Sequence, residues 1–286
     1  MRPVKRVVLL HDLCAVGKAA LTNMLPVLST MGLEACPIPT ILLSTHTGGY
    51  GKPAVRSTDP DYIRECAAHF KREKVSFDGI FVGYPGNTEV LEAVRDFVHC
   101  FPEVPVILDP IMGDHGKYYG NFGAVYGKAV RSFVPEAEVL LPNLTEACLL
   151  TETPYRTDFT EKELFSLCQK LDDAGRKRRT IVLTSAPASE NRKKIAVLMR
   201  VKEDESFFTI DFPACPGDYH GTGDLFDGVF LADYIEGLPI RTCIEQAHAF
   251  VKNCIQTSSR YAYSERDGLL IEQSLPFLDM KSNERG

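Results

Sequence analysis

The chain has 286 residues, of which 44% are hydrophobic and 24% charged, and its formal net charge at pH 7 is −6. This is the composition of a globular protein with ample core, at a length that a single α/β domain can reach. The negative charge argues against non-specific binding of nucleic acid, which needs a basic face.

The apolar run nearest the N-terminus, residues 7–10, is too short for a signal peptide core or a membrane span. We therefore expect a cytoplasmic protein that does not contact membranes. The nine cysteines are an odd number, widely spaced and without a Cys-x-x-Cys pair. They predict reduced, mostly buried thiols rather than disulfides or a zinc site.

The first part of the chain alternates apolar runs with segments of helical periodicity. The pattern predicts a strand at 7–10, a loop at 11–12, a helix at 17–31, a strand at 36–44, a helix at 59–74, a strand at 80–82 and a helix from Asn87 towards Cys100. Gly17-Lys18 resembles the end of a P-loop. That interpretation fails because Asp12 stands where glycine is required and Ala19 where Ser or Thr is required.

The second part continues the alternation. It predicts strands at 104–108, 139–141 and 180–183, an edge hairpin of 194–201 and 207–212 around an acidic turn at 202–205, a helix after a glycine-rich turn near 221, a helix at 240–261 and a frayed tail at 281–286. The basic run 176–179 is interpreted as a solvated helix end. The whole predicts one domain, 1–286: a three-layer α/β/α sandwich with a mostly parallel sheet.

Polar residues follow the predicted strands, where ligands bind in such sheets. Asp109 and Asp114 follow one strand, and Asn143 with Glu146 follows another. Carboxylates and an amide in these places suit a hydrated Mg²⁺ that keeps most of its waters. The alternative is purely structural: Asp109 caps a turn and Glu146 is an acid in the first turn of a helix.

The turn at residues 221–224, Gly-Thr-Gly-Asp, opens an amphipathic helix. Its glycines permit positive φ, and the first N–H groups of the helix have no partner within it, so the turn suits a phosphate. Asp224 would repel that phosphate unless it takes a proton from an attacking hydroxyl. The alternative is an ordinary capped helix. Asp227 is interpreted as a solvated first-turn acid rather than a catalytic group.

These motifs resemble the ribokinase-like superfamily and, within it, the pyridoxal kinase branch. The turn at 221–224 matches the signature, and residues 109–114 and 142–147 match the second and third blocks. Residues 44–48 resemble the substrate-side loop, and Gly83-Tyr84 resembles the block with the ring-contacting tyrosine. The start of the chain, residues 11–18 with 25–28, is similar to bacterial pyridoxamine kinases. The blocks stand in family order over residues 7–260.

The resemblance implies ATP-dependent phosphorylation of the 5′-hydroxymethyl group of a B6 vitamer, with Asp224 as the base. By position, it implies an anion hole formed by Gly221, Thr222 and Gly223. It implies ATP binding by Asn143, Glu146, Thr184 and Asp114, with Asp114 on a mobile flap, and Mg²⁺ binding, largely through water, by Asp109 and Glu146. The vitamer would be bound by Thr47, Tyr84, His46 and Asp12. The flap segments lie near 36–52 and 112–125.

The resemblance also implies a homodimer and a possible K⁺ requirement. His11-Asp12 departs from better-known relatives, which carry a ring-contacting serine there, so the preferred vitamer stays open. Two alternatives remain: a hydroxymethylpyrimidine kinase of the same fold, and a non-catalytic vitamin or nucleotide binder. Retention of Asp224 argues against the binder, because binding alone has no use for a base.

Overall fold

The computed structural model describes residues 2–120, 122–173, 179–187, 194–200, 207–213 and 219–278. The chain divides into two compact units, Met1–Phe81 with Cys215–Gly286, and Val82–Ala214. The acidic turn predicted at 202–205 and the tail predicted at 281–286 lie outside the described residues.

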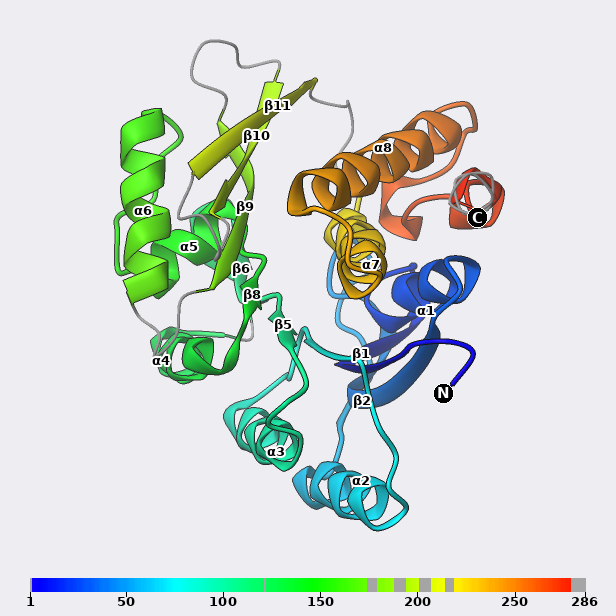
Figure 1. Cartoon of the computed structure of the whole chain (residues 1–286). Helices are drawn as coiled ribbons and strands as arrows, with labels where there is room; N and C mark the ends of the chain where they lie inside the picture. The colour runs from blue at the N-terminus through cyan, green and yellow to red at the C-terminus, as the bar shows by residue number, and fades with distance from the viewer. Residues whose placement is uncertain are drawn as a thin grey trace. The chain divides into compact units, whose positions relative to one another are not determined.

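The first unit is an α/β unit built on a strand order of β4-β1-β2-β3. Figure 1 labels its strands β1 and β2 and its helices α1, α2, α7 and α8. β1 and β2 run parallel, and β3 runs antiparallel to β2. The strands are β1 (Arg6–Val16), β2 (Glu34–Thr45), β3 (Val55–Ser57) and β4 (Gly79–Val82). The helices are α1 (Leu21–Thr30), α2 (Pro60–Arg72), α7 (Thr222–Ile235) and α8 (Ile240–Ser258), with short 3₁₀ helices η2 (Glu265–Asp267) and η3 (Ile271–Gln273).

α7 is the central helix of this unit, because α1 and α8 both pack against it. Every residue from Leu225 to Asp233 is buried. An apolar helix covered on several sides has no solvent-facing stripe, which explains why α7 carries so few polar residues. The buried packing of α7 fixes its first turn, where Asp224 lies.

β1 is longer than predicted, and the loop expected at 11–12 is wrong. The strand continues to Val16 and pairs with β2 along its length, with an irregularity in register between His11 and Leu13. His11 and Asp12 are 1% and 6% exposed. Polar side chains tolerate such burial only where they find hydrogen-bond partners, as these two do.

The second unit is also α/β, with the strand order β11-β10-β9-β8-β5. β5, β8 and β9 are parallel, and β9, β10 and β11 are antiparallel, which confirms the predicted edge hairpin. The strands are β5 (Val106–Leu108), β8 (Val139–Leu140), β9 (Thr180–Pro187), β10 (Lys194–Arg200) and β11 (Phe207–Pro213), with a separate hairpin of β6 (Gly113–Asp114) and β7 (Lys117–Tyr118).

The helices of the second unit are α3 (Thr88–Cys100), α4 (Ala124–Phe133), α5 (Leu144–Leu150) and α6 (Glu161–Asp173), with the 3₁₀ helix η1 (Val134–Glu136). Asn87 caps α3 as predicted, since its side chain accepts the Val90 N–H at 2.8 Å. The solvated helix end predicted at 176–179 is wrong for Arg179, which is 1% exposed. Residues 176–178 lie outside the described residues.

Candidate active site

The residues predicted to act on substrates fall into two groups, one in each unit. The first unit carries Asp12, His46, Thr47, Gly221, Thr222, Gly223 and Asp224. The second unit carries Tyr84, Asp109, Asp114, Asn143, Glu146 and Thr184.

Asp224 lies in the first turn of α7 and is held through both carboxylate oxygens. Its Oδ1 lies 3.2 Å from Nε2 of His11, and its Oδ2 accepts the N–H of Ala20 at 2.7 Å. Burial alone would raise the pKa of Asp224, but the hydrogen bond and charge of His11, together with the Ala20 N–H, lower this pKa below its usual range. The side chain is 12% exposed, so the carboxylate is fixed without being sealed from solvent.

The turn before Asp224 leaves the start of α7 without a capping side chain. Gly221 is the N-cap at φ 79°, and among the described residues no side-chain capping bond is made at this helix start. A Cβ at Gly221 would lie 2.4 Å from the carbonyl oxygen of Lys18, so both space and backbone conformation require glycine there. Gly223, in contrast to Gly221, does not adopt a positive φ. The space beside its Cα is open, since a Cβ placed there would have no neighbour within 4 Å.

His11 connects Asp224 to Asp12. Its Nδ1 lies 3.0 Å from Oδ1 of Asp12, and the second oxygen of Asp12 accepts the thiol of Cys14 at 3.1 Å. Burial lowers the pKa of His11, but the two neighbouring carboxylates outweigh burial and raise this pKa to about 10. His11 is a site residue that was not predicted from the sequence. The signal that could have found it was a histidine next to an aspartate directly after an apolar strand.

His46 lies in the loop after β2 and has a defined hydrogen-bond pattern. Its Nε2 donates to the carbonyl of Arg266 at 2.6 Å, and its Nδ1 accepts the N–H of Gly48 at 3.1 Å. Burial lowers the pKa of His46, so the ring is neutral with its proton on Nε2. The ring lies 4.6 Å from that of His220, between centroids. Thr47 is exposed beside it.

In the second unit, Asn143 and Glu146 form a capping box at the start of α5. Oδ1 of Asn143 accepts the Glu146 N–H at 2.9 Å, and Oε2 of Glu146 accepts the Asn143 N–H at 2.9 Å. Oε1 of Glu146 also accepts the N–H of Met112 at 3.2 Å. These bonds satisfy helix-terminal donors, so the structural alternative for Glu146 holds at least in part.

Glu146 is also affected by a second carboxylate. Burial, followed by the charge of Asp109, raises the pKa of Glu146 well above its usual range, although the backbone donors of Asn143 and Met112 lower it. A divalent cation would relieve this repulsion, and oxygen donors of this kind fit Mg²⁺. Among the described residues no group of three or more acids, histidines or cysteines forms a metal site. A cation here would keep most of its waters.

The β6–β7 hairpin is tied to the start of α5. Asn143 donates through Nδ2 to the carbonyl of Gly113 at 3.0 Å, and the N–H of Gly116 donates to Oγ1 of Thr145 at 2.9 Å. Asp114 is exposed on this hairpin, where its Oδ1 accepts the N–H of His115. Thr184 in β9 forms a parallel bridge with Asn143, which brings Thr184 beside the capping box.

Tyr84 is buried in an aromatic cluster. Its ring lies 5.1 Å from that of Phe122, and Phe122 stacks on Tyr126 at 3.8 Å between centroids, with an angle of 2° between the planes. Phe122 belongs to the segment predicted as a flap near 112–125. The aromatic cluster was not expected from the sequence, because Tyr84 lies far along the chain from the other two rings.

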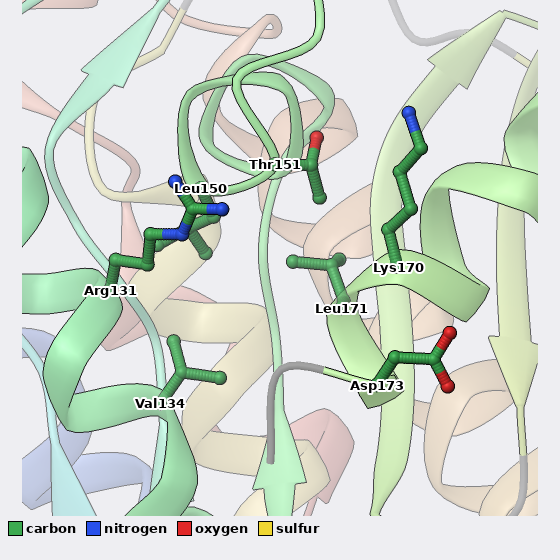
Figure 2. A pocket seen from close by; sticks show the side chains of 7 residues that line it. All are labelled: Arg131, Val134, Leu150, Thr151, Lys170, Leu171 and Asp173. Carbon is green, nitrogen blue, oxygen red and sulfur yellow. The ribbon is translucent and has the colours of Figure 1, made fainter.

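A pocket of about 300 Å³ lies elsewhere in the second unit (Figure 2). Its lining residues are Arg131, Val134, Leu150, Thr151, Lys170, Leu171 and Asp173. Leu150 and Thr151 stand at the end of α5, whereas Asn143 stands at its beginning. The pocket therefore lies away from the capping box, and none of the predicted site residues lines it.

Asp227 is 3% exposed, so its interpretation as a solvated acid is wrong: α7 is covered on the side where Asp227 lies.

The eight cysteines that the structure describes are free, and five of them are buried, which confirms the predicted burial. None of the described helices is long and apolar enough to span a membrane.

Solved structures of similar proteins establish the fold. A pyridoxal kinase from Lactobacillus plantarum superposes with a TM-score of 0.87 at 28% identity, covering 99% of both chains. This match confirms the three-layer α/β/α, ribokinase-like fold. A Bacteroides thetaiotaomicron protein described as a putative phosphomethylpyrimidine kinase, in a crystal form with pyridoxal, superposes with a TM-score of 0.91 at 33% identity, covering 97% of this chain and 96% of that one.

The chain belongs to the phosphomethylpyrimidine kinase family, whose model matches residues 22–267. A curated relative from Schizosaccharomyces pombe, described as a putative pyridoxal kinase, is 27% identical over 215 residues. That alignment covers 73% of this chain and 61% of the length of the yeast protein.

Proposed function

We propose that this protein transfers the γ-phosphoryl group of ATP to the 5′-hydroxymethyl group of a B6 vitamer. The similarity to the Bacteroides protein crystallised with pyridoxal, at 33% identity over nearly the whole chain, is the observation that carries the choice of substrate. The similarity to the proteins from Lactobacillus plantarum and Schizosaccharomyces pombe supports the same choice.

In the proposed reaction Asp224 accepts the proton of the vitamer hydroxyl. The hydroxyl oxygen forms a bond to the γ-phosphorus, the bond from that phosphorus to the bridging oxygen breaks, and ADP leaves. The uncapped N–H groups of Gly221, Thr222 and Gly223 would hold the charge of the transferring group, since the helix start has no side-chain cap. Thr47, Tyr84 and His46 are proposed to contact the ring.

The second unit would hold the nucleotide. Asp109 and Glu146 are proposed to bind Mg²⁺ largely through water, with Asn143 and Thr184 near the phosphates and Asp114 on the hairpin that covers them. Mg²⁺ would neutralise phosphate charge and orient the γ-phosphoryl group. The homodimer, the use of K⁺ and the cytoplasmic location stay predictions from the resemblance and the short apolar run at the N-terminus.

The substrate is tested by ADP release with pyridoxal, pyridoxamine, pyridoxine and hydroxymethylpyrimidine, with the product identified by mass. We expect turnover with at least one B6 vitamer. 5-Deoxypyridoxal, which lacks the accepting hydroxyl, is the control and should give no ADP above the ATP-only background.

A second candidate, a hydroxymethylpyrimidine kinase, is favoured by the family match over residues 22–267. Turnover of the pyrimidine alone would replace the proposed substrate by this one. Tight ligand binding with no turnover of any alcohol would instead identify a non-catalytic binder.

A further inference from the structure

A buried histidine separates two carboxylates in the first unit. His11 is 1% exposed, and its two ring nitrogens lie 3.0 Å and 3.2 Å from Oδ1 of Asp12 and Oδ1 of Asp224. The hydrogen-bonded series continues from Asp12 to the thiol of Cys14 at 3.1 Å. A buried polar side chain needs partners for both ring nitrogens, and His11 has them.

The hydrogen bond from His11 to Asp224 does not depend on the charge of the ring. If the ring is protonated, Nδ1 donates to Asp12 and Nε2 donates to Asp224. If the ring is neutral, Nδ1 can accept the backbone N–H of Asp12 at 2.9 Å, and the proton stays on Nε2. Both states direct an N–H from Nε2 to Asp224, because a carboxylate can only accept.

The other oxygen of Asp224 is held from the loop before α1. The N–H of Ala20 donates to it at 2.7 Å, and Ala20 adopts φ 54°, a conformation that non-glycine residues avoid. Such a conformation is strained and is found mostly where function requires it. The local backbone is thus arranged to present this N–H to Asp224.

We propose that His11 is a positioning residue for Asp224, fixing the orientation and the ionised state of the carboxylate through the Nε2–H bond, with Asp12 and Cys14 holding His11 in turn. This inference rests on the proposed function, in which Asp224 is the base. His11 itself is no base, because it is 1% exposed and Nε2 faces Asp224. Asp12 is predicted to contact the vitamer, yet its carboxylate oxygens face His11 and Cys14.

Holding a base by a hydrogen-bond donor weakens it, so the gain must come from geometry. In a loose phosphoryl-transfer transition state little proton transfer has occurred, and positioning with electrostatics supplies most of the catalysis. A displacement of about 1 Å in a reacting group can cost on the order of 10²-fold in rate. The rate gained because His11 orients Asp224 is therefore larger than the rate lost because the hydrogen bond makes Asp224 less basic.

A matched pair of substitutions separates the donor from the packing of the side chain. His11→Gln places an amide N–H near the position of Nε2, whereas His11→Met has similar bulk and no donor. We expect kcat to fall about 10²-fold in His11→Met and about tenfold in His11→Gln, with KM unchanged in both. His69→Gln, at an exposed histidine of α2, is the control and should behave as wild type.

The pH dependence of kcat separates loss of the hydrogen-bond donor from loss of packing, because a packing defect alone would not shift the profile. The titratable groups facing the bond are Asp12, Cys14 and Asp224 itself; His46 would lower the pKa of Asp224 only at a pH low enough to protonate its own ring, whose pKa burial lowers. Loss of the donor should shift the acid limb of the profile to higher pH in His11→Met, and by less in His11→Gln. Equal loss of kcat in both variants, with the acid limb unmoved, would overturn the proposal.

Nuclear magnetic resonance of the ligand-free protein tests the bond without any activity. Two-bond ¹H–¹⁵N correlations should show the proton of His11 on Nε2 from about pH 5 to 9, and ¹³C shifts should show a higher pKa of Asp224 in His11→Met. An unprotonated Nε2 would refute the inference. If wild type phosphorylates no vitamer, the proposed function fails while this measurement still decides the bond; if wild type is active and His11→Met keeps full kcat, only the inference fails.

Discussion

Asp224 and Glu146 occupy the same helical position in different units, yet their carboxylates have different kinds of hydrogen-bond partner. Each is the third residue of its helix, α7 or α5. Asn143 caps α5 and binds Glu146 in a reciprocal capping box. Gly221 caps α7 and has no side chain to offer, so the carboxylate of Asp224 bonds to His11 and Ala20 instead.

The capping residue therefore decides what an acid at the third position can do. Where the cap has a side chain, the acid completes the helix start and its oxygens serve backbone donors. Where the cap is glycine, the helix N–H groups stay open and the acid is held by other parts of the fold. One arrangement suits structure and a nearby cation, and the other suits an anion next to a base.

The two carboxylates also differ in their pKa. Donors around Asp224, His11 foremost, outweigh burial and lower its pKa. Burial and the charge of Asp109 raise the pKa of Glu146. Asp224 is thus committed to the ionised form that a base needs, whereas Glu146 needs a positive partner before it can hold a full charge.

Substitution of Asp224 should cause the greatest loss of activity. Asp224→Asn keeps the shape of the side chain and removes the charge and the basicity. We expect kcat to fall about 10³-fold with little change in KM for the vitamer, because general-base groups contribute on the order of 10²–10⁴. The loss should be the same at every Mg²⁺ concentration. A loss below about tenfold would remove Asp224 from the role of base.

A smaller effect is expected on the Glu146 side, and it should depend on Mg²⁺. Glu146→Gln should raise the Mg²⁺ concentration for half-maximal rate about 10- to 100-fold, the range found when groups that support a metal are removed. Measured at a fixed concentration of free ATP, high Mg²⁺ should recover most of the rate. Glu152→Gln, at an exposed carboxylate that pairs with Arg131, is the matched control in the same unit.

If Glu146→Gln is equally impaired at all Mg²⁺ concentrations, Glu146 is a capping residue only. Thermal unfolding with and without EDTA separates that outcome from a folding defect, because Mg²⁺ that binds the folded state must raise Tm in wild type.

Much of the fold and of the candidate site could be predicted from the sequence, because the signals are local. Apolar runs and caps such as Asn87 and Asn143 act within a few residues, so element types and the edge hairpin follow from the pattern. The turn at Gly221 is recognisable as well, since its conformation excludes other residues. The site residues that were located by resemblance also lie in motifs of only a few residues.

The parts that sequence could not reveal depend on contacts between distant segments. His11 lies 213 positions from Asp224, and nothing near His11 in the chain indicates that partner. Arg179 ends a basic run that is typical of a solvated surface, yet its side chain is buried and Nη1 bonds to the carbonyl of Val134, 45 positions away. Asp227 was expected to be exposed for the same reason: the packing that covers α7 is tertiary.

The proton on His11 should also contribute modestly to the stability of the fold. The pKa of His11 is raised from its ordinary value of 6.5 to about 10 in the folded protein, so between these values the folded state binds more protons than the unfolded state. The stability that this proton supplies is fully present below pH 6.5 and is lost as pH rises towards 10. The effect is at most about 1.4 kcal/mol per pH unit for one group.

Urea unfolding of wild type and His11→Gln from about pH 6.5 to 8.5 measures this contribution. The window stays below the region where the raised pKa values of Cys14, Cys36 and Cys254 would add to it. The wild-type free energy of unfolding should fall relative to the variant by about 1 kcal/mol per pH unit. His46, whose pKa is lowered, acts with the opposite sign in both proteins and cancels in the difference. If the free energies of unfolding of the two proteins change in parallel with pH, His11 is neutral, and the bond from Nε2 then orients Asp224 without a charge on the ring.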